Sequence, residues 1–453
     1  MTEKGNQIHI GRSLPPAAAP LFFRDILNGL RGLVNGTGET ERFRDELKKY
    51  FGVRHCFLVS SGKAALTLLL KALHDLHPQR NEVVIPAFTC YSVPASVLRA
   101  GMKIRLCDTD PRTLDFNISE LQEYFQTTGD RPISRLLAVL PTHLFGRPAE
   151  IDTLRDLVTD RNLTIIEDAA QAMGGRWQGK KLGTLGDAGF FSLDRGKAFS
   201  TVEGGVIVTN HDDLAGKISK RLNQLADYSR TETIQLVCKA FFILVFQRPS
   251  LFWIPRALPF LGLGKTVYDP DFRMRRFSPF AAGLARNWRS RLEKFRKIRR
   301  KNCNNLALFL EKSLNIYCTD TDTVTEMIRL PVFLNDQRQR AETIQRSKQQ
   351  GLGIMPAYPT AVNGISALRN IFKGQEYPGA ELLSKSLLTL PIHPFVTKKD
   401  IQRLLAANGN LVAVSSDKGK KTLMHFVAIC PKTKIFFRVQ GARKVDNSGK
   451  ADG

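Results

Sequence analysis

A lysine, an aspartate and a turn of small residues have the types and spacing that indicate covalent cofactor chemistry. Lys197 ends the run Ser192-Leu-Asp-Arg-Gly-Lys197, and Asp168 follows the apolar run Leu163–Ile166. The turn Ser60-Ser61-Gly62-Lys63 precedes a helical stretch, and the backbone N–H groups at a helix start suit a phosphate. Pyridoxal phosphate needs this combination, because its aldehyde takes a lysine amine, its ring nitrogen a carboxylate and its phosphate N–H and hydroxyl donors.

Short apolar runs that alternate with helical stretches must position these residues. This alternation predicts βαβ units and a mostly parallel sheet that is covered by helices on both faces. Ligands bind at the carboxyl edge of such sheets, where Asp168 is expected. The predicted strands are 55–59, 82–85, 103–107, 135–140, 163–166 and 188–191, and the predicted helices include 21–34, 39–50, 64–76, 91–100 and 149–160.

Six segments of the sequence are similar to one family of enzymes. The sequence resembles the nucleotide-sugar aminotransferases of the DegT–DnrJ–StrS family, and the segments follow the family order from about residue 40 to 405. The resemblance implies an α/β protein of the fold type I pyridoxal phosphate architecture, with a large domain and a smaller C-terminal α/β domain. The segments are FLVSSGKAAL, EVVIPAFTCYSVPASVLRAG, HLFGRPAEIDTL, TIIEDAAQAMGGRWQGKKLGTLGDAGFFSL, STVEGGVIVTN and LLTLPIHPFVTKKDI.

The resemblance also implies an activity and three residue roles. The enzyme would move an amino group from an amino-acid donor such as glutamate to a keto group on a nucleotide-linked sugar. Lys197 would be the Schiff-base lysine and proton shuttle, Asp168 the partner of the pyridine nitrogen, and Gln171 a neighbour of the ring hydroxyl. The family further implies a homodimer with active sites at the subunit interface.

Four more residues follow from the same comparison. Ser192 and the backbone N–H groups of Gly62 and Lys63 would bind the cofactor phosphate. Cys90 stands where an aromatic residue often stacks on the cofactor.

The sequence departs from the family pattern near these positions. Asp194–Arg195–Gly196 stand where the family usually has His-Pro-Thr or similar, and Lys63 stands where a threonine is usual. The family motif Asn-Tyr-Arg-Met, whose asparagine reaches the phosphate in the partner subunit, is replaced here by Asp271-Phe272-Arg273-Met274. A carboxylate that faces a phosphate is electrostatically unfavourable. These changes concern substrate identity more than the chemistry of the lysine.

Composition and charge restrict the class of protein. The 453 residues are 43% apolar and 24% charged, which excludes a disordered chain, a collagen-like chain and a disulfide scaffold. The balance of 67 Lys and Arg against 42 Asp and Glu gives +25 and favours polyanionic partners. The seven cysteines form no C-x-x-C pair, so we expect reduced thiols in a cytoplasmic protein and no metal site.

The changes of composition along the chain predict five parts, and the start of the sequence does not resemble a secretory signal. Strand-like runs at Phe426–Ile429 and Ile435–Val439 fall in the last part. The parts are an arm (1–40), a large cofactor-binding domain (41–233), an aromatic-rich insertion (234–270), a small domain (271–410) and a basic extension (411–453).

The aromatic-rich insertion has two interpretations. Its longest apolar run, Ala240–Phe246, is too short to span a membrane, so the segment is either a buried insertion or dimer contact, or an anchor in a membrane interface. In the second case a basic stretch, residues 271–301 with 12 Lys and Arg, would be attracted to anionic lipid. The anchoring side chains would be Phe241, Phe242, Phe246, Phe252 and Trp253.

Other functions stay open on the sequence alone. The keto substrate could be lipid-linked or presented at a membrane, or the chain could be a catalytically idle regulator or a nucleic-acid binder. The intact Lys197 argues against idleness, and nothing beyond the charge of +25 indicates specific binding of nucleic acid. His143 is expected to be a packed or capping residue rather than a substrate ligand, and Gly264-Lys265-Thr266 lacks the first glycine of a phosphate-binding loop.

Overall fold

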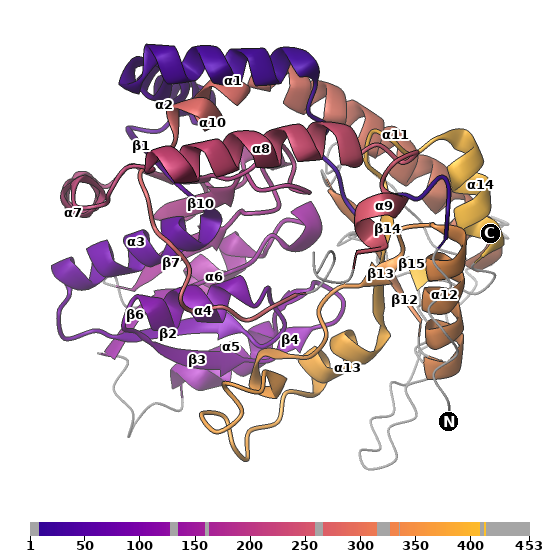
Figure 1. Ribbon diagram of the computed structural model, residues 1–453. Helices are drawn as coiled ribbons and strands as arrows, with labels where there is room; N and C mark the ends of the chain where they lie inside the picture. The colour runs from indigo at the N-terminus through magenta and orange to yellow at the C-terminus, as the bar shows by residue number, and fades with distance from the viewer. Residues whose placement is uncertain are drawn as a thin grey trace, which may run out of the picture. The chain divides into compact units, whose positions relative to one another are not determined.

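A seven-stranded sheet lies at the centre of the described chain (Figure 1). The computed structural model describes residues 9–126, 135–158, 163–258, 266–314, 327–334, 336–407 and 412–413. The strand order is β1-β11-β10-β7-β6-β2-β3, and all strands but β11 run in one direction, which confirms the predicted mostly parallel sheet. The strands are β1 (His55–Val59), β2 (Glu82–Pro86), β3 (Lys103–Cys107), β6 (Leu136–Val139), β7 (Thr164–Asp168), β10 (Ala188–Ser192) and β11 (Gly205–Thr209).

Helices cover both faces of this sheet. Neighbouring residues of one strand pack into different cores, since Phe190 contacts the cluster around α3 whereas Phe191 contacts the cluster around α2. On one face lie α3 (Gly62–Leu76), α4 (Ser92–Arg99) and α7 (Asp212–Asn223). On the other lie α2 (Thr37–Phe51), α5 (Ile118–Gln126), α6 (Ile151–Leu157) and the start of α11 (Trp288–Leu314).

A second, four-stranded sheet follows α11 in the chain. Its order is β13-β14-β12-β15, and every pair in it is antiparallel. Its apolar residues form one core with α14, in which Leu330, Leu390 and Leu404 are buried. The elements are β12 (Arg329–Phe333), α12 (Gln337–Gln350), β13 (Met355–Pro356), α13 (Pro378–Ser386), β14 (Leu387–Pro391), α14 (Lys398–Ala406) and β15 (Val412–Ala413).

Short elements complete the described chain. β4 (Thr109–Asp110) pairs with β5 (Asp115–Phe116), and β8 (Arg176–Trp177) pairs with β9 (Lys180–Lys181). α1 (Phe23–Asn35) packs along α10 (Pro279–Leu284).

The aromatic-rich insertion forms α8 (Arg230–Phe246) and α9 (Trp253–Arg256). α8 begins with a capping box, because Ser229 Oγ accepts from Glu232 N and the Glu232 carboxylate accepts from Ser229 N. Within the described ranges, no helix is both long and apolar enough to cross a membrane. The predicted strands near residues 426 and 435 lie outside the described residues.

Two members of the predicted basic stretch do not face solvent. Arg291 pairs with Asp25 at 3.1 Å, and both side chains are buried. Arg299 is also buried and donates to the carbonyl of Ala198. The expectation that the whole stretch attracts lipid is therefore wrong for these two arginines, because their charges are used to hold neighbouring segments.

Candidate active site

The predicted site residues gather at the carboxyl edge of the seven-stranded sheet. Asp168 is the last residue of β7 and Ser192 the last residue of β10, and these two strands pair in parallel. Gly62 follows β1, Cys90 follows β2, and Lys197 lies in the loop after β10. Because all these strands run in the same direction, segments far apart in the sequence meet at one edge.

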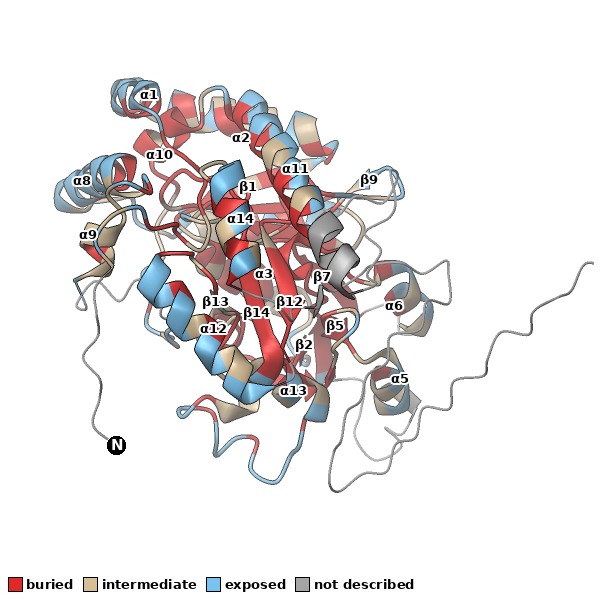
Figure 2. Cartoon of the chain, turned by 90° about the vertical axis from the view of Figure 1, so that its right-hand side faces the viewer, coloured by how far each residue is buried: buried red, intermediate tan, exposed pale blue. Residues whose placement is uncertain are grey.

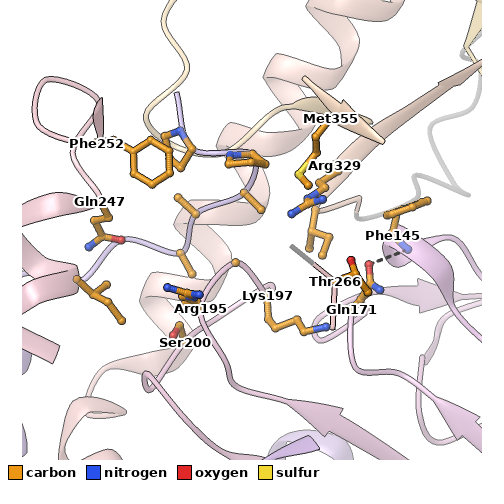
Figure 3. Close-up of a pocket in the computed structure, with 18 of the residues that line it drawn as sticks. Phe145, Gln171, Arg195, Lys197, Ser200, Gln247, Phe252, Thr266, Arg329 and Met355 are labelled. Carbon is orange, nitrogen blue, oxygen red and sulfur yellow. Dashed lines mark hydrogen bonds between the residues drawn. The ribbon is translucent and has the colours of Figure 1, made fainter. Parts of the chain in front are cut away.

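A cavity of about 300 Å³ lies at this edge and contains three of the predicted residues, Lys197, Gln171 and Cys90. Figure 3 shows the Lys197 side chain extending toward Gln171, with Arg329 pointing into the same space from β12. Asp168, Ser192, Gly62 and Lys63 do not line this cavity.

Asp168 and Lys197 interact electrostatically. Burial raises the pKa of Asp168, and a hydrogen bond from Ala170 N at 3.0 Å together with the nearby charge of Lys197 partly offsets this rise. In the described parts of the chain, the other oxygen of Asp168 has no hydrogen-bond partner, and Lys197 Nζ forms no ion pair. Within the described chain, this carboxylate oxygen and the amine are thus not committed to another side chain.

Ser192 and Gly62 form a second group beside Lys197. A Cβ atom on Gly62 would lie 2.8 Å from Cβ of Ser192, so the first turn of α3 touches the end of β10. Ser61 caps this helix by accepting from Ala64 N at 3.1 Å. Ser192 Oγ donates to Asp194 Oδ2 at 3.2 Å, and burial raises the pKa of Asp194. A phosphate at the start of α3 would therefore lie near this carboxyl group.

The Lys63 side chain does not line the cavity and has partners elsewhere. Its ammonium pairs with Asp269 at 2.8 Å and lies 4.5 Å from the centre of the Phe272 ring. Its backbone N–H still lies in the first turn of α3, as the prediction for the phosphate requires. Asp271 is exposed and pairs with Arg99 at 3.4 Å.

Gln171 and Cys90 are both held by hydrogen bonds, and the two partners of Gln171 also line the cavity. Gln171 accepts from Phe145 N at 3.3 Å and donates to Tyr358 Oη at 3.1 Å (Figure 3 marks the first bond). Ser92 Oγ donates to Cys90 Sγ at 3.0 Å. Burial, the nearby Cys90 and other neighbours hold the pKa of Tyr358 well above its usual value.

His143 is a packed residue, as expected. It is fully buried, its Nδ1 accepts from Ala149 N at 2.9 Å, and its Nε2 lies 2.7 Å from Glu167. Glu167 also accepts from the backbone N–H groups of Gly183 and Gly186. Because both ring nitrogens have partners inside the protein, His143 supports the loop after β6 rather than a substrate.

Several residues that line the cavity were not found from the sequence. Arg329 faces the cavity, burial lowers its pKa, and among the described residues its guanidinium has no hydrogen-bond or ion-pair partner. Tyr358, the segment Pro15–Ala19 and residues of α8 such as Ile243 and Phe246 also line it. No local motif marks these positions; their roles depend on how the second sheet and the insertion fold back on the large one.

Known proteins resemble this chain in sequence and in fold. A GDP-perosamine synthase of Caulobacter vibrioides is 36% identical over 188 residues, which are 42% of this chain and 48% of that protein. The chain thus matches about half the length of this curated relative.

Two solved structures share the fold. One is PseC of Helicobacter pylori, an aminotransferase involved in the biosynthesis of pseudoaminic acid, with a TM-score of 0.68 and 15% identity over 87% of this chain and 98% of that one. The other is the sugar aminotransferase CalS13 of Micromonospora echinospora, with a TM-score of 0.67 and 19% identity over 87% and 98%. These identities establish the fold alone.

The sequence profile of one family matches nearly the whole described chain. The match covers residues 23–407, from the start of α1 to the residue after α14. It includes the strand ends that carry Asp168 and Ser192 and the loop that carries Lys197. The chain therefore belongs to the DegT/DnrJ/EryC1/StrS aminotransferase family.

Proposed function

We propose that the protein is a pyridoxal-phosphate-dependent aminotransferase that moves an amino group from an amino-acid donor such as glutamate to a keto group on a nucleotide-linked sugar. The observation that carries the proposal is the electrostatic pair of Lys197, in the cavity, and the buried Asp168, whose second oxygen has no hydrogen-bond partner in the described chain. Membership of the family and the names of the similar proteins support the same activity.

The residues present fit the cofactor. Bound pyridoxal phosphate would supply an aldehyde for an amine and an electron-withdrawing ring. The unpaired oxygen of Asp168 would accept a hydrogen bond from the protonated ring nitrogen, and Lys197 would bind the aldehyde carbon and then move a proton. Ser192 Oγ and the first turn of α3 at Gly62 and Lys63 would donate to the phosphate.

Cys90 and Gln171 would lie against the ring of the cofactor. Both line the cavity beside Lys197, and Gln171 is fixed by Phe145 and Tyr358. Arg329 would bind the carboxylate of the amino-acid donor, since a guanidinium that lines the cavity and has no acidic partner among the described residues favours an anion that enters it.

The test is a spectral titration of the purified chain with the cofactor. We expect an absorption band near the edge of the visible range, which is lost in Lys197→Ala and in Lys197→Arg. Lys220→Ala, which changes an exposed lysine of α7, should keep the band. A wild-type protein that binds cofactor without forming the band would contradict the role of Lys197, and circular dichroism of each variant separates this result from misfolding.

A screen of half-reactions identifies the substrates. Amino acids are added one at a time to the loaded enzyme, and the band should disappear with glutamate or a similar donor. Keto sugars carrying a nucleoside diphosphate should then restore it, whereas the free sugars should not. Restoration by free sugars alone would contradict the proposed class of acceptor.

We also propose a cytoplasmic homodimer. Free thiols are typical of a reducing compartment, and the five described cysteines form no disulfide with one another. Light scattering should give twice the chain mass, and a monomer that retains full transaminase activity would contradict a shared active site.

A further inference from the structure

α1 buries mainly small and polar residues together with Ile26, and it exposes most of its large apolar residues. Asp25, Asn28, Gly29 and Gly32 are buried, and the two glycines let the helix approach α10 closely. A Cβ atom on Gly32 would lie 2.3 Å from the carbonyl oxygen of Pro279. The exposed positions of the helix include Phe23, Leu27, Leu30, Leu33 and Val34. Apart from Ile26, the large apolar residues of α1 thus face away from the core, whereas a surface helix of a globular protein usually turns its apolar side toward the core.

α8 extends this apolar surface. Ile234, Phe241, Phe242 and Val245 are exposed, while other residues of α8 share a buried cluster with Ile26 of α1. Figures 1 and 2 both show the two helices side by side at the same part of the surface. We call this surface the α1–α8 face. Its ten residues are Phe22, Phe23, Leu27, Leu30, Leu33, Val34, Ile234, Phe241, Phe242 and Val245, out of fifteen exposed large apolar residues among those described.

The exposed charged side chains of α1 and α8 are all positive. Every exposed residue within the bounds of α1 and α8 is apolar, neutral polar, cysteine, or one of the bases Arg24, Arg31, Arg230 and Lys239. The two acidic residues of these helices are turned inward or paired, since Asp25 pairs with Arg291 and Glu232 with Arg275. Of these four bases, Lys239 pairs with Glu203. The other three have no ion pair within the described chain.

We propose that the α1–α8 face binds an anionic lipid surface. Large apolar side chains would enter the headgroup region, and the arginines at their edge would meet the lipid phosphates. A second copy of the chain fits less well, because the same face of that copy would offer unpaired arginines and no exposed acidic residue of α1 or α8 to pair with them. Ile243 and Phe246 of α8 also line the cavity. A protein bound to the membrane through α8 would therefore hold one wall of the cavity next to the lipid.

The structure changes the set of anchoring residues that the sequence predicted. Phe241 and Phe242 are exposed, as an anchor requires. Phe246, Phe252 and Trp253 are only partly exposed, and the first two line the cavity. Most of the proposed anchor therefore comes from α1, where the sequence indicated only a short helix.

The test is sedimentation of the full chain, loaded with cofactor, with vesicles of phosphatidylcholine alone or of phosphatidylcholine mixed with the anionic lipid phosphatidylserine. We expect binding to the anionic vesicles. Leu30→Gln with Leu33→Gln should weaken it about tenfold through lost apolar burial. Arg24→Gln with Arg31→Gln should weaken it about 25-fold, since each base near such a surface contributes about fivefold.

The matched control is Ile371→Gln with Leu382→Gln, two exposed apolar residues elsewhere on the chain, which should bind as the wild type does. All variants keep residues 414–453, so any attraction by this basic end is the same in each. Equal binding of wild type and both α1 variants would overturn the proposal, as would a wild type that ignores anionic vesicles. A change of mass by light scattering in the leucine variant would show instead a contact between copies. None of these outcomes depends on transaminase activity, so they do not bear on the proposed function.

Discussion

At the scale of single residues, Asp194 is the most consequential departure from the family pattern. Its carboxyl group accepts from Ser192, the hydroxyl proposed to bind phosphate, and Lys197 lies close enough to lower its pKa against the larger effect of burial. The Asp194 carboxylate and the cofactor phosphate would therefore compete for the hydroxyl group of Ser192. A protonated Asp194 would remove the conflict, and its raised pKa makes protonation easier than for an exposed aspartate.

Asp194→Asn should bind the phosphate-bearing cofactor about tenfold more tightly near neutral pH, because it removes a negative charge beside the phosphate. The affinity of the wild type should fall as pH rises through the pKa of Asp194, and the variant should lack this fall. The measurement is the dissociation constant for cofactor across pH. Asp213→Asn, on the exposed start of α7, should match the wild type. If both variants behave alike, Asp194 does not face the phosphate.

Arg329→Lys should raise the KM for the amino-acid donor by about tenfold to a hundredfold, because a lysine cannot form the two parallel hydrogen bonds that a guanidinium gives a carboxylate. The cofactor band should be unchanged. Steady-state kinetics with the donor varied provides the measurement. Arg346→Lys, an exposed residue of α12, is the control. An unchanged KM in Arg329→Lys would place the donor carboxylate elsewhere.

The sequence predicted Lys197 and Asp168 because each lies beside a strand end that a local pattern marks. Arg329 was not predicted, since it reaches the cavity from a second sheet whose position depends on contacts between distant segments. The side chain of Lys63 was also not predicted, because its partner Asp269 is 206 residues away in the chain. Local patterns locate the residues on strand ends, and tertiary packing decides which side chains turn into the cavity.

At the scale of elements, the contact between α1 and α10 depends on glycine. Gly32→Ala should lower the free energy of unfolding by about 1–3 kcal/mol, because the added methyl group meets the backbone of α10. Gly38→Ala, in α2, is the control, since a Cβ atom there meets nothing within 4 Å. It should be neutral or slightly stabilising, as alanine favours a helix. Chemical denaturation measures both, and equal stabilities would mean that α1 moves to accept the methyl group.

Elements bounded by clear turns were predicted closely. β1 and β3 have the predicted bounds, and α3 begins two residues earlier than predicted because Ser61 caps it. The antiparallel direction of β11 was not predicted, since an apolar run carries no sign of its direction. α8 was predicted only as an aromatic-rich segment. Its nearly uniform distribution of apolar residues hides the helical period that usually marks a surface helix.

At the scale of the whole molecule, Glu39 joins three segments. It accepts from Arg286 at 2.6 and 2.8 Å, from Arg42 at 2.9 Å and from Asn35 at 3.1 Å. Its side chain is 2% exposed, and these bonds, that of Arg286 first, lower its pKa to about 2. A single carboxylate therefore connects the end of α1, the start of α2 and the link between α10 and α11.

This lowered pKa predicts how stability depends on pH. The contribution of Glu39 is fully present above about pH 4.5, the usual pKa of the group, and is lost as pH falls toward 2. Glu39→Gln should be about 1–2 kcal/mol less stable than the wild type at pH 7, allowing for solvent screening, and the difference should shrink below pH 4.5. Urea denaturation at several pH values gives the comparison, with the exposed Glu41→Gln as control. A difference that does not change with pH would contradict an ionic origin.

The first described residues are held by residues from the far end of the chain. Arg12 pairs with Asp400, 388 positions later, and the carbonyl of Pro15 accepts from His393. Because Pro15–Ala19 also form one wall of the cavity, that wall cannot be assembled until α14 has been made. The ribosome adds about 5–20 residues per second, so Arg12 would wait roughly 20–80 seconds for the synthesis of its partner Asp400. A nascent chain would thus complete this cavity as one of the last events of its biogenesis.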